Sequence, residues 1–162
     1  GPQGAGALWH RPGAPLKAVQ YGGGQERGLR SGTENVAAIA GFGAAVEAAI
    51  RDLPKYQALG PRRDAMEARL EAEGGVIVTG KASPRLAGVS NFAKPGFVSA
   101  GAACSSGKVK RSLVLMAMGA DDTLAESAIR TSFGWCTLPS DFDGVADAWL
   151  KAAERIIAKE KA

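Results

Sequence analysis

The chain has 162 residues, of which 46% are hydrophobic and 22% charged, a globular composition that excludes a disordered or fibrous protein. Its 20 lysines and arginines are scattered among 16 acidic residues, so the net charge of +4 does not indicate nucleic acid as a partner. No apolar run reaches the roughly 18 residues of a membrane span, and the first residues lack the pattern of a signal peptide. We therefore expect a soluble protein that does not contact a membrane. Because the two cysteines do not resemble a secreted disulfide framework, a reducing cytoplasm is the expected compartment.

The chain begins with two glycine clusters, "GPQGAGAL" and "YGGGQERGLRSGT", which are typical of backbone that turns sharply or approaches a ligand closely. After Thr33, apolar residues recur at helical spacing and predict a helix over 34–51. Ser31 and Glu34 have the form of a capping box at its start. The glycine-rich start of the chain is therefore expected to lead into a long helix.

A proline and two glycines are expected to divide the middle of the chain. Pro54 is expected to interrupt the first helix, and a second helix is predicted over 61–73, with Met66 and Leu70 facing inward. Short β-rich runs bounded by glycine, proline and charged residues then predict strands in "GVIVTG" and "AGVSNFA".

The last third is expected to contain helix, strand and helix. The pattern from Val109 to Met118 is helical, "SAIRTSFGW" predicts a strand, and Ser140 begins a final helix. The inward face of that helix is expected to comprise Phe142, Val145, Ala146, Trp149, Ala153 and Ile156. Together these elements predict an α/β fold with the glycine clusters on loops, where functional sites are usually assembled.

The two cysteines differ in their surroundings. Cys104, in "GAACSSGKVK", has small neighbours and little apolar cover, and the basic residues that follow it favour a thiolate. A free cysteine is more often a small buried hydrophobe, which is the interpretation we give to Cys136 beside Trp135. The single histidine, His10, is far away in sequence, so a Cys–His hydrolase has little support, and no metal-ligand spacing or disulfide framework is present.

Six stretches, in order, resemble the C-terminal part of the NifS/IscS-type cysteine desulfurases, which are pyridoxal-phosphate enzymes of the class V aminotransferase group. They are "GPQGAGAL", "GGGQERGLRSGTENV", "GVSNFA", "VSAGAACSSG", "VLMAMG" and "AIRTSFGW", and together they extend over essentially the whole chain. The resemblance implies the C-terminal portion of a fold type I transferase. Residues 1–33 would be a remnant of the large cofactor domain, and 34–162 a linking helix and the small domain with the cysteine loop.

The resemblance also implies roles for particular residues. Cys104 matches the cysteine that takes sulfur from L-cysteine as a persulfide, releasing L-alanine, and its glycine-rich loop suits a nucleophile that must move. Arg130 matches the arginine that holds the substrate carboxylate; without the family it would be a salt-bridged strand residue. Thr33 matches the threonine that reaches the cofactor phosphate of the neighbouring subunit in a homodimer; without the family it would be a helix cap. A sulfur acceptor or iron–sulfur scaffold protein is the implied partner.

The chain also departs from the family pattern. The family's Schiff-base lysine precedes the "GPxGxGAL" segment, and none of the nine lysines here stands in a matching context, so we expect no activity from this chain alone. Between Phe97 and Val98, relatives carry further residues, and a helical crossover between parallel strands would not fit there. Either the chain is a natural or engineered remnant, or the sequence joins pieces of a longer chain.

Two hypotheses of different classes follow. The first is a cysteine desulfurase that serves iron–sulfur cluster or other sulfur-cofactor assembly, with a selenocysteine-directed relative as a variant. The second is a non-catalytic interaction module that keeps the small-domain fold without pyridoxal phosphate. The enzyme would bind the yellow cofactor and release alanine from cysteine, whereas the module would be colourless and inert.

Overall fold

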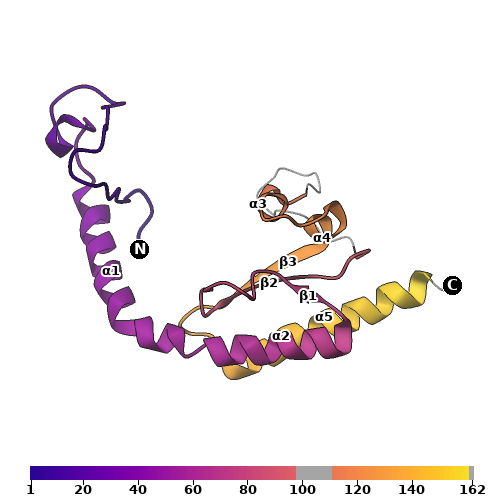
Figure 1. The fold of residues 1–162 in the computed structure, drawn as a ribbon. Coiled ribbons are helices and arrows are strands. Elements are labelled where there is room, and N and C mark those ends of the chain that lie inside the picture. The colour runs from indigo at the N-terminus through magenta and orange to yellow at the C-terminus, as the bar shows by residue number, and fades with distance from the viewer. Residues whose placement is uncertain (98–110, 161–162) are drawn as a thin grey trace. The chain divides into compact units, whose positions relative to one another are not determined.

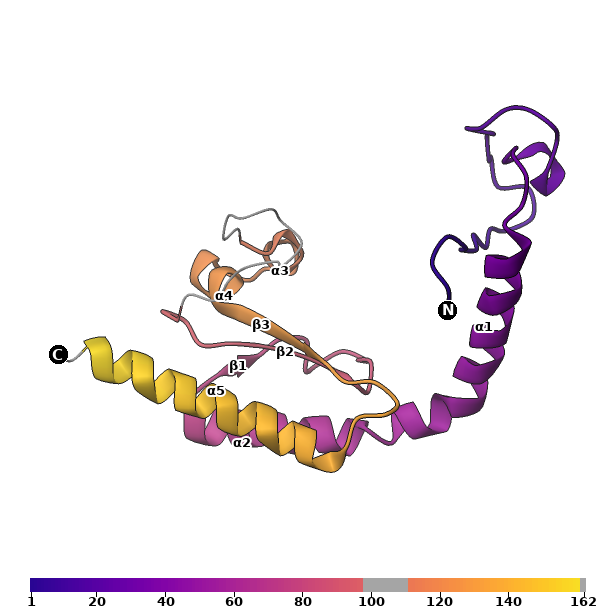
Figure 2. The same cartoon turned by 180° about the vertical axis from the view of Figure 1, so that it is seen from behind.

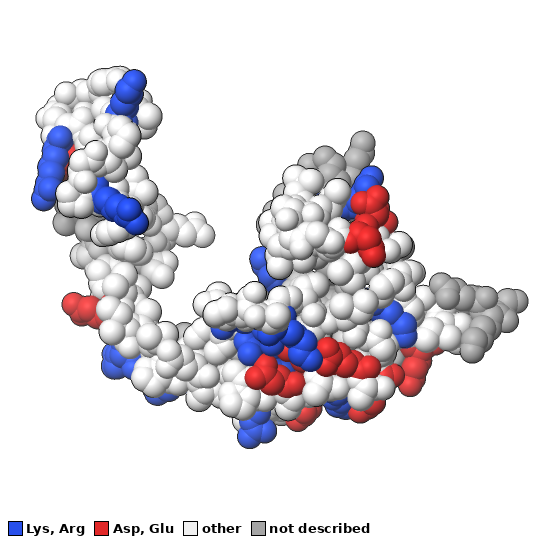
Figure 3. All heavy atoms as spheres, in the orientation of Figure 1, with Lys and Arg blue, Asp and Glu red and all other residues white. Residues whose placement is uncertain are grey.

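The computed structural model describes residues 1–97 and 111–160, with side chains described up to residue 158. The chain divides into two compact units, Gly1–Leu53 and Pro54–Ala162. Among the described residues, no helix has the length and apolar character that crossing a membrane requires. Figure 3 shows basic and acidic side chains interspersed on the face that it views.

The first unit consists of loops, a short 3-10 turn at Glu26–Gly28 and most of helix α1 (Val36–Gln57). The N-cap differs from the expected capping box, because Asn35 Oδ1 accepts the Ala38 N–H at 3.2 Å. The apolar face expected on this helix is largely exposed: Val36 is 72% exposed and Ile50 68%, while Ala38 is buried.

The expectation that Pro54 interrupts the first helix is wrong. Pro54 lies inside α1, which continues to Gln57. Proline in a helix removes one hydrogen-bond donor and disturbs the preceding turn, but its carbonyl still accepts the Ala58 N–H at 3.0 Å. The chain therefore completes one further turn before α2 begins.

The second unit contains a three-stranded antiparallel sheet in the order β1-β2-β3. Its elements are α2 (Gly60–Gly74), β1 (Ile77–Val78), β2 (Val89–Ala93), α3 (Leu113–Ala117), α4 (Asp122–Ser127), β3 (Ala128–Ser132) and α5 (Pro139–Glu160). The sequence predicted all three strands, but the expectation that the chain after Phe97 is too short assumes that the second and third strands are parallel, and that assumption is wrong. Since β2 and β3 pair antiparallel, their connection needs no such crossover.

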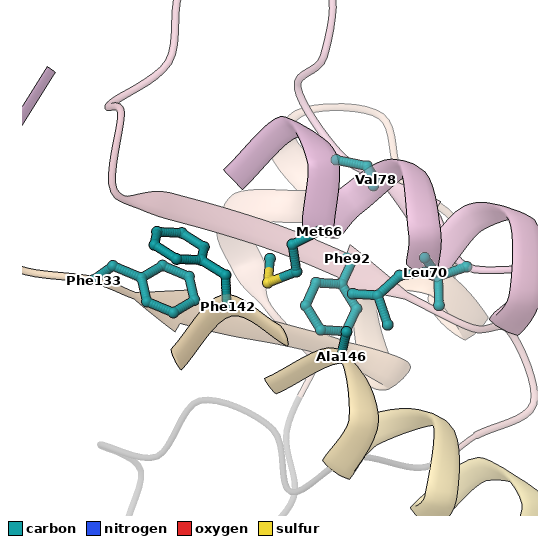
Figure 4. Packing of buried hydrophobic residues seen from close by; sticks show 8 residues of the cluster. Met66, Leu70, Val78, Phe92, Phe133, Phe142 and Ala146 are labelled. Carbon is teal, nitrogen blue, oxygen red and sulfur yellow. The ribbon is translucent and has the colours of Figure 1, made fainter. Parts of the chain in front are cut away.

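Helices α2 and α5 lie side by side along one face of the sheet in both views (Figures 1 and 2). Between these layers, Phe92 packs edge-to-face on Trp149 with ring centroids 6.0 Å apart, and Phe133 stacks on Phe142 at 4.0 Å. Figure 4 shows this core, whose buried members are Met66, Leu70, Val76, Val78, Phe92, Phe133, Phe142 and Ala146.

The core confirms most of the predicted inward faces. Met66 and Leu70 are 3% and 0% exposed, and Ala146 on α5 is fully buried. The face of α5 ends sooner than expected, because Ile156 is 39% exposed. The helix predicted from Val109 is described only as α3, Leu113–Ala117. The domain division at residue 33 stays a prediction.

Candidate active site

Arg130 lies in the middle of β3, directly opposite Asn91 of β2. It is exposed, and its guanidinium forms no ion pair with another residue in the part of the chain that the structure describes. The alternative interpretation, a salt-bridged strand residue, therefore finds no partner there. An exposed guanidinium on a rigid strand is suited to gripping a carboxylate with two hydrogen bonds.

Thr33 lies three residues before α1 and is exposed. It does not cap the helix, since that hydrogen bond comes from Asn35. The first turn of α1 contains no acidic residue. The exposed hydroxyl of Thr33, just before a helix N-terminus, can donate a hydrogen bond to a phosphate group, and the nearest carboxylate in sequence is that of Glu34, which directly follows Thr33. The residues present in this unit thus fit one phosphate contact of pyridoxal phosphate.

The segment that precedes Thr33 contains a left-handed turn. Glu26 and Arg27 have φ values of 50° and 58°, which side-chain-bearing residues rarely adopt and which cost free energy. Gln25 helps to hold this conformation: its Oε1 accepts the Gly32 N–H at 3.1 Å, while the Gly32 carbonyl accepts from Arg30 at 3.1 Å. These hydrogen bonds tie the turn to the residues that lead into α1.

The predictions for the two cysteines have different outcomes. Cys104 lies outside the described residues, so its assignment stays a prediction. Cys136 is exposed, and the expectation that it belongs to the core is wrong. It lies in a hydrogen-bonded turn, in which Gly134 donates to Thr137 Oγ1 at 2.9 Å and Thr137 donates to the Gly134 carbonyl at 3.1 Å. This turn leaves the neighbouring Trp135 69% exposed as well.

A buried ion pair that was not predicted from the sequence anchors the β1–β2 loop (residues 79–88). Glu67 of α2 is completely buried and accepts hydrogen bonds from Arg85 of the loop at 2.7 and 2.9 Å. These bonds are the main reason that the pKa of Arg85 is raised, against the opposing effect of burial. Arg63 adds a hydrogen bond of 2.6 Å to the carbonyl of Leu86. The available signal was Glu67, an acidic residue at an inward position between Met66 and Leu70.

Comparison with known proteins agrees with the motifs. The chain is 34% identical to a mitochondrial cysteine desulfurase of Arabidopsis thaliana over 96% of its own length and 38% of the relative's. It is 37% identical to a cysteine desulfurase of Klebsiella pneumoniae over 98% of its length and 44% of the relative's. Its fold matches a NifS-like protein of Rickettsia africae with a TM-score of 0.71 at 25% identity, over 85% of this chain and 40% of that one. No protein-family model matches the chain.

The fold is that of part of a pyridoxal-phosphate-dependent fold type I enzyme, and it is mixed α/β as expected. Within that class, the chain corresponds to a C-terminal portion of the NifS/IscS-type cysteine desulfurases. It spans about two fifths of the length of these curated relatives. The alignments extend over 173 and 174 residues, more than the 162 of the chain, so the relatives carry additional residues within the matched region.

Proposed function

We propose that the protein is a cysteine desulfurase, which takes the sulfur of L-cysteine and passes it to an acceptor for iron–sulfur cluster or other sulfur-cofactor assembly. The observation that carries this proposal is Arg130, an exposed guanidinium at the position matched by the family motif, in a chain similar to cysteine desulfurases along 96% of its length. Acceptor proteins of that kind are the proposed partners.

In this proposal Arg130 binds the carboxylate of L-cysteine with two parallel hydrogen bonds and fixes the orientation of the substrate. In a homodimer, Thr33 and the N–H groups at the start of α1 would hold the phosphate of the pyridoxal phosphate bound to the neighbouring subunit, and the bound cofactor would supply the electron sink for breaking bonds at the substrate carbons.

Sulfur transfer is assigned to the Cys104 thiolate. It attacks the substrate sulfur, the S–S bond of a persulfide forms, and the carbon–sulfur bond of the substrate breaks. The carbon takes up a proton and leaves as L-alanine, so that the cysteine sulfur remains on the enzyme as Cys104–S–SH. No external oxidant or reductant is needed until the persulfide is passed on.

A homodimer is part of the proposal. The large apolar side chains exposed on the first unit support it, because apolar side chains exposed in such number are typical of a surface that contacts another protein. Trp9, Val19 and Tyr21 are each more than 80% exposed, and Val36 and Ile50 lie uncovered on α1. Light scattering at several protein concentrations would test this state.

The test of function uses protein expressed from the complete reading frame, incubated with L-cysteine and a thiol reductant. We expect equal amounts of alanine and sulfide, and a visible absorption band from bound pyridoxal phosphate. Cys104→Ser should abolish sulfide release, and Arg130→Lys should raise the KM for L-cysteine because lysine cannot form the two-pronged contact. Cys136→Ser is the matched control, since this cysteine is exposed and should be dispensable. A colourless protein that releases no alanine would instead support the non-catalytic module.

A further inference from the structure

A row of polar residues crosses the sheet at the level of Arg130. Asn91 is the register partner of Arg130 on β2. On the other side of Asn91, the pairing of Val78 with Phe92 places Thr79 next, and the Thr79 N–H donates to the Asn91 carbonyl at 2.9 Å. Thr79, Asn91 and Arg130 thus occupy adjacent positions on three successive segments of the sheet.

This row lies on the face of the sheet opposite α2 and α5. Phe92 points into the core between the sheet and these helices, where it is 1% exposed. Successive side chains of a strand point to opposite faces, so Asn91 points away from the helices. Asn91 and Thr79 are half-buried and Arg130 is exposed. The face is therefore accessible to a small ligand at this level.

The strand register brings Asn91 and Arg130 close together. The Phe133 N–H donates to the Gly88 carbonyl at 2.7 Å, so Gly88 and Phe133 form a hydrogen-bonded pair of the antiparallel ladder. Such pairs alternate along an antiparallel ladder with non-hydrogen-bonded pairs, whose Cα atoms are only about 4.5 Å apart. Counting along the register, Asn91 and Arg130 form a pair of the closer kind.

The hydroxyl of Thr79 orients the Asn91 side chain. It donates to Asn91 Oδ1 at 2.8 Å. Because the two branches of an amide diverge, the NH₂ group is directed away from Thr79, the side on which Arg130 lies. Neither of its two N–H donors has a partner among the residues that the structure describes. A donor with a fixed direction and no partner beside an unpaired guanidinium is suited to a shared anionic ligand.

We propose that Asn91 is a second carboxylate-binding residue, which donates a hydrogen bond from Nδ2 to the substrate carboxylate held by Arg130. This inference rests on the proposed function, since it takes the substrate to be an amino acid bound at Arg130. A carboxylate accepts at four lone-pair positions, and a two-pronged guanidinium contact leaves two of them for other donors. Thr79 is a positioning residue that acts through Asn91.

The experiment compares variants of the protein expressed from the complete reading frame. Asn91→Ala should raise the KM for L-cysteine about tenfold with a much smaller change in kcat, because a hydrogen bond to a charged group is lost. Asn91→Asp should raise it further, since a negative charge then faces the substrate carboxylate. Thr79→Val should also raise the KM for L-cysteine, but by less than Asn91→Ala does. Thr79→Ser should leave this KM at the wild-type value. Ser132→Ala is the control, because Ser132 is exposed on the same face of β3, two residues from Arg130.

L-cysteine methyl ester separates carboxylate binding from a structural role. If Asn91 binds the carboxylate, the Asn91→Ala variant loses affinity for L-cysteine but not for the ester, which has no charge at this position. An equal loss for both compounds, or a KM within twofold of wild type, would overturn the inference. If the protein shows no enzymatic turnover, the binding of L-alanine can still be measured by calorimetric titration. If wild type binds L-alanine and Asn91→Ala binds it more weakly, the inference is supported although the proposed function has failed. Equal affinity in the two proteins, or no binding by wild type, would refute the inference.

Discussion

Replacing Arg85 with methionine leaves the Glu67 carboxylate buried without its main partner. The Glu67 side chain is 1% exposed, and Arg85 meets it with two hydrogen bonds of 2.7 and 2.9 Å. Among the described residues, the other cation paired with Glu67 is Arg63, whose Nε lies 4.0 Å away and which is already bound to Asp64 at 2.7 Å.

The expected cost follows from this geometry. Removing one partner of a buried ion pair costs about 3–5 kcal/mol, because the remaining charge stays desolvated. Arg85 is 17% exposed and Arg63 remains nearby, so we expect a loss at the lower end, about 3 kcal/mol. The double variant Glu67→Leu with Arg85→Met removes both charges and should lie within about 1 kcal/mol of wild type.

Urea unfolding followed by circular dichroism measures both variants. Lys81→Met is a matched control in the same loop: its pair with Glu71 at 2.7 Å is 49% and 33% exposed, and an exposed pair contributes about 1 kcal/mol or less. If Arg85→Met costs less than the Lys81 control, or if the double variant is as unstable as Arg85→Met, the reasoning about the buried charge is wrong.

Three further predictions concern packing and capping. Phe92→Ala should lower the free energy of unfolding by about 3–5 kcal/mol, since this ring is 1% exposed at the centre of the core; a loss below about 1 kcal/mol in urea unfolding would contradict it. Gly88→Ala should lower the free energy of unfolding by about 1–3 kcal/mol, because the new Cβ would clash with the Phe133 carbonyl oxygen, a backbone atom of the paired strand segment; an unchanged urea midpoint would contradict this. Asp121→Ala should lower the thermal midpoint at neutral pH, where the ionised carboxylate caps α4. The hydrogen bond from Thr123 lowers the pKa of Asp121, so the stabilisation is present above the usual carboxyl pKa and disappears as the pH falls through the lowered one; midpoints that differ equally at pH 7 and pH 2 would refute this.

Much of the fold could be predicted because periodicity reports burial. Met66 and Leu70 recur at helical spacing and are buried, and the strand around Phe92 was predicted from a short β-rich run bounded by glycine and proline. The apolar face of α1 was also recognised as apolar, yet it is exposed. Composition alone does not tell which surface a hydrophobic face will meet.

The errors arose where hydrogen bonds, rather than hydrophobicity, decide the conformation. Cys136 was expected in the core from its apolar neighbours, but the turn between Gly134 and Thr137 directs it outward. Ser31 and Glu34 have the letters of a capping box, yet Asn35 makes the capping bond one residue before α1. In each case several nearby polar side chains could form the hydrogen bond to the backbone, and the sequence alone does not show which of them forms it.

The candidate site was predictable only in part. Arg130 could be singled out from its motif, whereas its neighbours Thr79 and Asn91 could not, because they come together only through strand pairing. Residues far apart in sequence meet according to register, and a shift of one residue would place Asn91 on the other face.

The most direct test of the central claim is the mass of the Cys104 peptide after a single turnover with L-cysteine and no acceptor. We expect that peptide to gain one sulfur atom, in an amount equal to the alanine released, and the Cys136 peptide to remain unchanged. Alanine released without sulfur on Cys104, or sulfur found on Cys136 instead, would contradict the account.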